Sequence, residues 1–231
     1  MFSAERIFDL LVMGWLSTVP LVIGSITTVA IFVERYLKMR GLEAQSRDLS
    51  TEVIEALARR DLAGARQTCE SSDTPFASLL LEGLRWQNVA IEDLERVFAT
   101  IRAEMSTSLR SGIWLIGTTG SLAPFVGLFG TVVGIIRAFQ DMAEHGAGGF
   151  EVVAAGISEA LVATGAGLFV AITALLFFNY LQVRAAGIAA VYARSCERFL
   201  QALLYVETAG AAGSPAQSES EAPSGELAPA S

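Results

Sequence analysis

Charged residues are scarce in this chain. Asp, Glu, Lys and Arg make up 17% of its 231 residues, whereas a soluble domain usually carries about 25%. Hydrophobic residues make up 52%. This balance excludes an ordinary soluble domain and predicts an integral membrane protein.

Residues that bind metals are also few. The chain has one histidine, His145, and two cysteines, Cys69 and Cys196, with no metal-ligand spacing between them. This excludes a zinc or haem site, and we expect no metal, no cofactor and two reduced thiols.

Enzyme and nucleic-acid motifs are missing as well. The sequence has no phosphate-binding glycine loop with lysine and no nucleophile–base pair. Its net charge is −8, and its basic residues form no patch that would follow a nucleic-acid backbone. We therefore expect neither an enzyme nor a nucleic-acid partner.

Three uncharged stretches are long enough to cross a bilayer, which takes about 20 helical residues. They run over 10–33, 111–136 and 160–183. The first is too long and lacks the small-residue site expected of a cleavable signal peptide. The predicted fold class is an all-α membrane protein with three transmembrane helices and long cytoplasmic helical extensions. The expected segments are the N-terminal segment with the first transmembrane helix (1–38), a cytoplasmic helical domain (39–110), the second transmembrane helix (111–142), a periplasmic loop (143–156), the third transmembrane helix (157–184), a cytoplasmic C-terminal helix (185–208) and a disordered acidic tail (209–231).

Lysine and arginine predict the orientation. Eleven of the sixteen basic residues lie between the first and second spans, three follow the third, and the other side holds only Arg6 and Arg137. Because basic loops stay in the cytoplasm, we expect a periplasmic N-terminus and a cytoplasmic C-terminus in the bacterial inner membrane.

The extensions read as helices. Asp61 is placed to cap one short helix, and Pro75 to begin another. From Ile91 no breaker occurs before the membrane, and the simplest prediction is one helix of roughly 75 Å from about Ile91 to Met142. The third span keeps a helical apolar stripe as far as Val206. The Ala, Gly, Ser, Pro and Glu composition from 209 onward predicts disorder.

Small residues recur at four-residue spacing in the second and third spans, which lets helices approach closely in lipid. The residues concerned are Ala123, Gly127 and Thr131, the pair Gly130 and Gly134, and Ala163, Gly167 and Ala171.

Polar groups in these spans allow two interpretations. Thr131 and Thr164 both lie about five residues inside the outer ends of antiparallel spans, so we expect them at similar depth. Their hydroxyls can hydrogen-bond a helix or line an ion path. Pro124 frees a backbone carbonyl in mid-membrane. Glu159, at the outer start of the third span, is either functional or a glutamate favoured by the helix N-terminus.

No aspartate, lysine or histidine lies within any of the three spans. A proton relay through a bilayer normally needs a titratable group near its middle. If ions cross here, another polypeptide must supply that group.

Two motifs carry a family resemblance. LAPFVGLFGTVVGII at 122–136 and GISEALVATGAGL at 156–168 resemble, in order and separation, the second-span and third-span signatures of the ExbB/TolQ/MotA proton-channel family. MotA-type chains have four spans, so this chain is more similar to ExbB and TolQ.

The resemblance implies a homopentamer around a dimer of a single-span ExbD/TolR-like subunit, whose membrane aspartate carries the proton. It implies an ion-pathway role for Thr131, Thr164 and Glu159. It also implies a TonB/TolA-like or gliding-machinery partner, and work in TonB-dependent transport, the Tol-Pal system or an Agl-type gliding motor. The residues expected to contact partners are Pro124, Gly127, Gly130, Gly134, Ala163 and Gly167.

Two other functions remain open. A structural membrane oligomer would use its small residues for packing only, and Glu159→Gln and Thr164→Val would then be silent. A small-solute transporter is disfavoured because three spans contain no inverted repeat.

Overall fold

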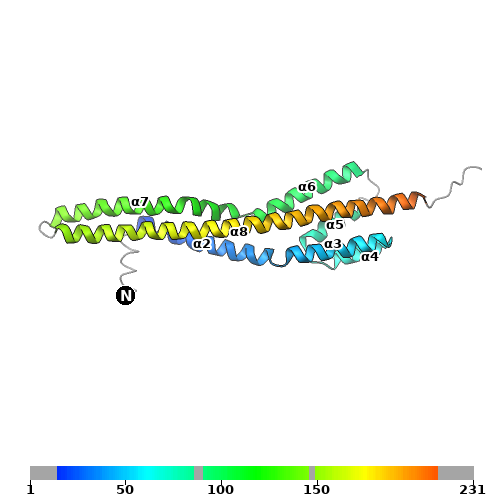
Figure 1. Cartoon of the computed structure of the whole chain (residues 1–231), viewed down its shortest axis with the longest axis horizontal. Coiled ribbons are helices and arrows are strands. Elements are labelled where there is room, and N and C mark those ends of the chain that lie inside the picture. Colours follow the sequence, from blue (N-terminus) through cyan, green and yellow to red (C-terminus); the bar gives the residue numbers. More distant parts are fainter. Residues whose placement is uncertain (1–14, 86–90, 146–148, 213–231) are drawn as a thin grey trace, which may run out of the picture. The chain divides into compact units, whose positions relative to one another are not determined.

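The computed structural model of the chain describes residues 15–85, 91–145 and 149–212, and every regular element in these ranges is an α-helix. The predicted tail therefore lies outside the described residues, apart from 209–212, which are helical. The helices are α2 (Trp15–Met39), α3 (Leu42–Ala58), α4 (Leu62–Glu70), α5 (Pro75–Arg85), α6 (Ile91–Arg110), α7 (Ile113–His145) and α8 (Gly149–Ala212) (Figure 1).

Three helical stretches are long and apolar enough to cross a membrane, and they lie within Thr18–Ala58, Ile113–Ala143 and Gly149–Val206. This confirms the predicted all-α membrane protein with three spans. The chain forms two compact units. The first comprises the described residues within Met1–Ala44 and Ile101–Val191, and the second comprises those within Gln45–Thr100 and Tyr192–Ser231.

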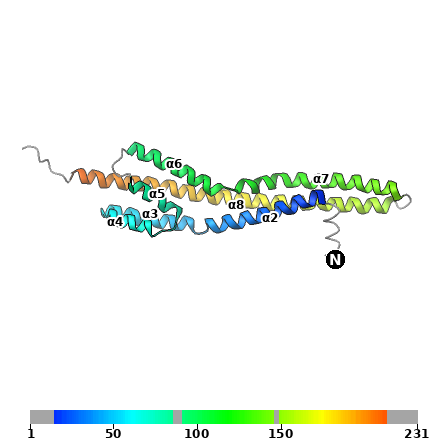
Figure 2. The same cartoon turned by 180° about the vertical axis from the view of Figure 1, so that it is seen from behind.

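In the first unit, α2 packs along α7, and α7 lies beside α8 in both views (Figures 1 and 2). One buried contact joins Leu21 of α2, Ala123 of α7 and Ala171 of α8. Further along α2, the ring of Phe32 stacks on Phe177 at 3.9 Å between centroids. Large apolar side chains on the outer faces are exposed, which suits contact with lipid or other transmembrane helices.

The predicted single helix from Ile91 to Met142 is wrong, because the chain breaks between α6 and α7. Gly112 has φ +76°, a left-handed conformation that glycine adopts easily and that commonly ends a helix. Arg35 of α2 donates a hydrogen bond at 3.3 Å to the Ser108 carbonyl in the last turn of α6, and the Ser111 amide donates to the same carbonyl at 3.2 Å. The sequence signal was a basic residue, Arg110, followed by Ser-Gly.

The predicted loop 143–156 is also wrong in its extent. Helix α7 continues to His145 and α8 begins at Gly149. Contacts between the two helices explain this, since a Cβ on Gly156 would lie 2.5 Å from that of Ala138, and one on Gly149 would lie 3.2 Å from the Met142 sulfur. Packing thus continues beyond the uncharged stretches.

The second unit has its own apolar core. The ring of Phe76 stacks on Tyr192 at 4.9 Å, and Phe98 meets Phe199 edge-on at 5.8 Å. Both predicted helix starts are confirmed, because Asp61 accepts a hydrogen bond from the Gly64 amide at 2.8 Å and Pro75 is the first residue of α5.

Cys69, in α4, should be chemically inert in the folded protein. Burial raises the pKa of its thiol to about 11, with a smaller contribution from Glu70. In a Cys196→Ser background at pH 8, we expect iodoacetamide to label the folded chain about a hundredfold more slowly than the SDS-unfolded chain, because only the thiolate reacts. The folded state holds the thiol proton up to a higher pH than the unfolded state does, so the free energy of unfolding should fall as pH rises from about 9 to 11. Equal labelling rates would contradict this prediction.

Candidate functional site

The second and third spans touch backbone to backbone. A Cβ added to Gly127 would lie 3.0 Å from the Ala163 carbonyl oxygen, and one added to Gly167 would lie 2.7 Å from that of Ala123. A Cβ on Gly134 would lie 2.7 Å from the Ala160 Cβ. These contacts confirm that the small residues serve helix packing.

The predicted partner-contact residues therefore fall into two groups, those at the α7–α8 contact and those elsewhere on α7. Gly127, Gly134, Ala163 and Gly167 lie at the contact between α7 and α8 of one chain, and Gly130 is buried. Pro124 lies half-buried inside α7. The carbonyl it deprives of a donor belongs to Gly120, which is buried against Leu175 of α8. That the six predicted residues contact a partner remains a prediction.

Both threonine hydroxyls donate to backbone carbonyls of adjacent α7 residues. The Thr164 hydroxyl donates to the Gly127 carbonyl oxygen at 3.0 Å and so joins α8 to α7. Thr131 is buried, and its hydroxyl donates to the Leu128 carbonyl of its own helix at 2.7 Å. Since their acceptor carbonyls belong to the adjacent residues Gly127 and Leu128, which are about 1.5 Å apart along the helix axis, the two hydroxyls lie at similar depth.

Both hydroxyls retain acceptor capacity. A threonine oxygen has two lone pairs besides its donated proton. Each oxygen can therefore accept a hydrogen bond from water or from a protonated partner while holding its carbonyl. The site combines fixed hydroxyls with closely packed backbones.

Glu159 lies apart from the threonines. It is half-buried and precedes Ala160, which packs on Gly134. It is about 140° around α8 from Thr164 on an ideal helix, and about 7.5 Å away along the axis. Its carboxylate makes no hydrogen bond or ion pair with any residue that the structure describes. The structure thus places it at the margin of the α7–α8 contact.

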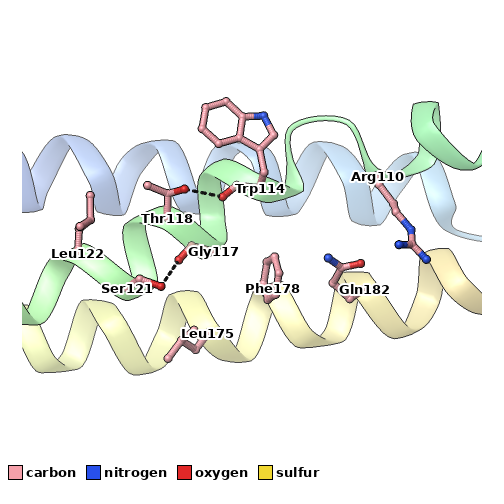
Figure 3. Close-up of a pocket in the computed structure, with 9 residues that line it drawn as sticks. All are labelled: Arg110, Trp114, Gly117, Thr118, Ser121, Leu122, Leu175, Phe178 and Gln182. Atoms are coloured by element: carbon pink, nitrogen blue, oxygen red, sulfur yellow. Dashed lines mark hydrogen bonds between the residues drawn. The ribbon is translucent and has the colours of Figure 1, made fainter.

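A groove that the sequence interpretation missed lies along the Arg110 end of α7 and α8 (Figure 3). Its volume is about 550 Å³. The sequence signal was the helical spacing of Trp114, Thr118, Ser121 and Leu122 on one face of α7. The lining residues are Arg110, Trp114, Gly117, Thr118, Ser121, Leu122, Leu175, Phe178 and Gln182.

Among the described residues, no group of three His, Cys, Asp or Glu side chains could hold a metal ion. The fold and site define a class: a three-span helical membrane protein whose second and third spans pack through small residues and threonines.

Comparison with known proteins identifies the family. A sequence model of the MotA/TolQ/ExbB proton channel family matches residues 71–194, and the chain belongs to this family. It is similar to the biopolymer transport protein ExbB of Pseudomonas putida (32% identity, 81% of this chain and 58% of the relative). The ExbB of Neisseria meningitidis serogroup A is also 32% identical, over 71% of this chain and 79% of the relative.

A shorter match is with the Tol-Pal system protein TolQ of Haemophilus influenzae (39% identity over 40% of each chain). The resemblance seen in the sequence is therefore confirmed.

Proposed function

We propose that this chain is the channel-wall, stator-type subunit of an inner-membrane motor that couples proton flow to mechanical work in the envelope. The observation that carries the proposal is the Thr164–Gly127 hydrogen bond between two spans of a proton-channel family member, with the Thr131 hydroxyl on the adjacent Leu128 carbonyl. Relatives named for biopolymer transport and for the Tol-Pal system support it.

The proton carrier is supplied by a second polypeptide. No Asp, Glu, Lys, Arg or His lies within 10–33, 111–136 or 160–183. In our proposal a single-span ExbD/TolR-like subunit brings a membrane aspartate, which alternates between a hydrated position near Thr131 and Thr164 and a dry one. Five copies of the chain surround a dimer of this partner, with Glu159 at the outer end of the path.

The proposed orientation follows from the basic residues, with the N-terminus in the periplasm and the C-terminus in the cytoplasm. The periplasmic region of the partner then receives the force and defines the process driven: TonB-dependent transport, Tol-Pal function or gliding. Pro124, Gly130 and the neighbouring small residues form the proposed contact with the partner.

A structural membrane oligomer is the second candidate. It is favoured by the fact that both threonine hydroxyls already donate to carbonyls of their own chain. In that case the threonines serve packing only.

Purification from native membranes in mild detergent, followed by mass spectrometry, tests the proposal. We expect a co-purified single-span protein with an aspartate in its span and a periplasmic domain, and this domain would name the process. Repeated recovery of homo-oligomers without such a partner would leave no titratable group for the proton, and the structural oligomer would replace the motor.

A further inference from the structure

The groove at the Arg110 end of α7 and α8 is apolar along most of its length. Trp114 and Leu122 are eight residues apart on α7, so its wall extends over about 12 Å. Its base is formed where Gly117 meets Phe178, since a Cβ on this glycine would lie 2.8 Å from the ring. The volume of about 550 Å³ is within the range of small-ligand sites.

The two hydroxyls in the wall do not make it polar. Thr118 donates to the Trp114 carbonyl at 3.0 Å, and Ser121 donates to that of Gly117 at 3.0 Å (Figure 3). Because these protons are already bonded within α7, the wall does not require a hydrogen-bonding ligand. It suits a hydrocarbon chain.

One end of the groove is cationic. Arg110 points toward α8, beside Gln182 (Figure 3). The guanidinium makes no hydrogen bond or ion pair with any described residue, and the lining contains no acidic side chain. Guanidinium groups bind phosphate oxygens through two parallel hydrogen bonds.

The position of this end also suits a lipid headgroup. Arg110 immediately precedes the uncharged second span, so it lies at the membrane boundary. Trp114 is 66% exposed and one turn further along, and tryptophan favours this interfacial depth. Basic pockets between transmembrane helices bind the headgroups of acidic lipids.

We propose that this groove binds one anionic phospholipid, with its phosphate on Arg110 and Gln182 and an acyl chain along Phe178 and Leu175. The proposal requires that α7 and α8 span the membrane, and it does not depend on motor function. In the proposed orientation this lipid belongs to the cytoplasmic leaflet.

Quenching of Trp114 by brominated lipid tests the site. A Trp15→Phe, Trp86→Phe chain, with Trp114 as its only tryptophan, is reconstituted in vesicles of equal phosphatidylglycerol and phosphatidylcholine. Bromine is placed on the acyl chains of one lipid or the other. We expect brominated phosphatidylglycerol to quench about twofold or more strongly than brominated phosphatidylcholine, because one arginine enriches anionic lipid severalfold.

Arg110→Gln should bring this ratio to about one, whereas Arg102→Gln, on α6 outside the groove, should leave it unchanged. The summed quenching by the two lipids reports that each variant is still inserted. Equal quenching in the chain that keeps Arg110, or an unchanged ratio in Arg110→Gln, would overturn the proposal. Quenching by neither lipid would also overturn it, because a partner helix or a second copy would then fill the groove.

Discussion

Replacement of Thr164 by valine is expected to slow proton uptake into proteoliposomes by about tenfold or more. Valine keeps the shape but removes the second donor to the Gly127 carbonyl, which still accepts the Thr131 amide within α7, and the loss of such a hydrogen bond costs about 0.5–1.5 kcal/mol. The proposed path also loses the hydroxyl oxygen that would accept from the partner's aspartate. A penalty of about 1.4 kcal/mol in the barrier corresponds to a tenfold change in rate.

The assay uses the chain co-purified with its single-span partner and a pH-sensitive dye inside the vesicles. Thr164→Ser retains the hydroxyl and should retain most of the flux. Thr173→Val is the matched control, because that hydroxyl bonds the Phe169 carbonyl of its own helix at 2.9 Å and lies outside the proposed path. Full flux in an assembled Thr164→Val complex would refute the ion-path assignment and favour a packing role.

Replacement of Gly167 by alanine is expected to destabilise the α7–α8 pair by about 1–3 kcal/mol. The added Cβ would lie 2.7 Å from the Ala123 carbonyl oxygen and 3.0 Å from the Gly127 Cα. Both are backbone atoms, so the helices themselves must move apart. For a chain of this size, the apparent thermal midpoint in mild detergent should fall by roughly 2–10 °C.

Gly165 provides the matched control. It lies two residues away on the same helix, and a Cβ there would have no neighbour within 4 Å. Both substitutions gain the same helix propensity of about 1 kcal/mol, so the difference between Gly165→Ala and Gly167→Ala isolates the close contact. Equal midpoints for the two variants would show that the two helices separate easily at Gly167.

Much of the fold could be predicted because the thickness of the bilayer sets the length of a transmembrane helix, and its hydrocarbon core disfavours charged residues. Any uncharged helix of about 20 residues can span the bilayer, so the three spans followed from the sequence. The extension of the third helix to Val206 followed from its apolar stripe. The break at Gly112 and the continued helices around 143–156 were not predicted. They depend on contacts with other helices, such as Arg35 on the Ser108 carbonyl and Gly156 on Ala138.

The site shows the same division. Four-residue spacing placed Gly127 and Thr131 on one face of α7, and Ala163 and Gly167 on one face of α8. The spacing did not predict that these two faces contact each other, because it defines one face of a helix but not the rotation of the neighbouring helix. Glu159 was grouped with the threonines from the motif, whereas the structure places it at the margin of the contact.

The sequence alone determined a three-span helical membrane protein of a proton-channel family, with no Asp, Glu, Lys, Arg or His inside its three uncharged stretches. Charge, the length of apolar stretches and short motifs are local properties, so they can be identified from the sequence without knowing how the helices pack. Only the tertiary structure decided that Thr164 bonds the Gly127 carbonyl, that Gly167 admits no side chain, and that an apolar groove begins at Arg110. Each of these depends on the rotation and depth of α7 relative to α8. That arrangement is determined by the packing of many side chains from different helices.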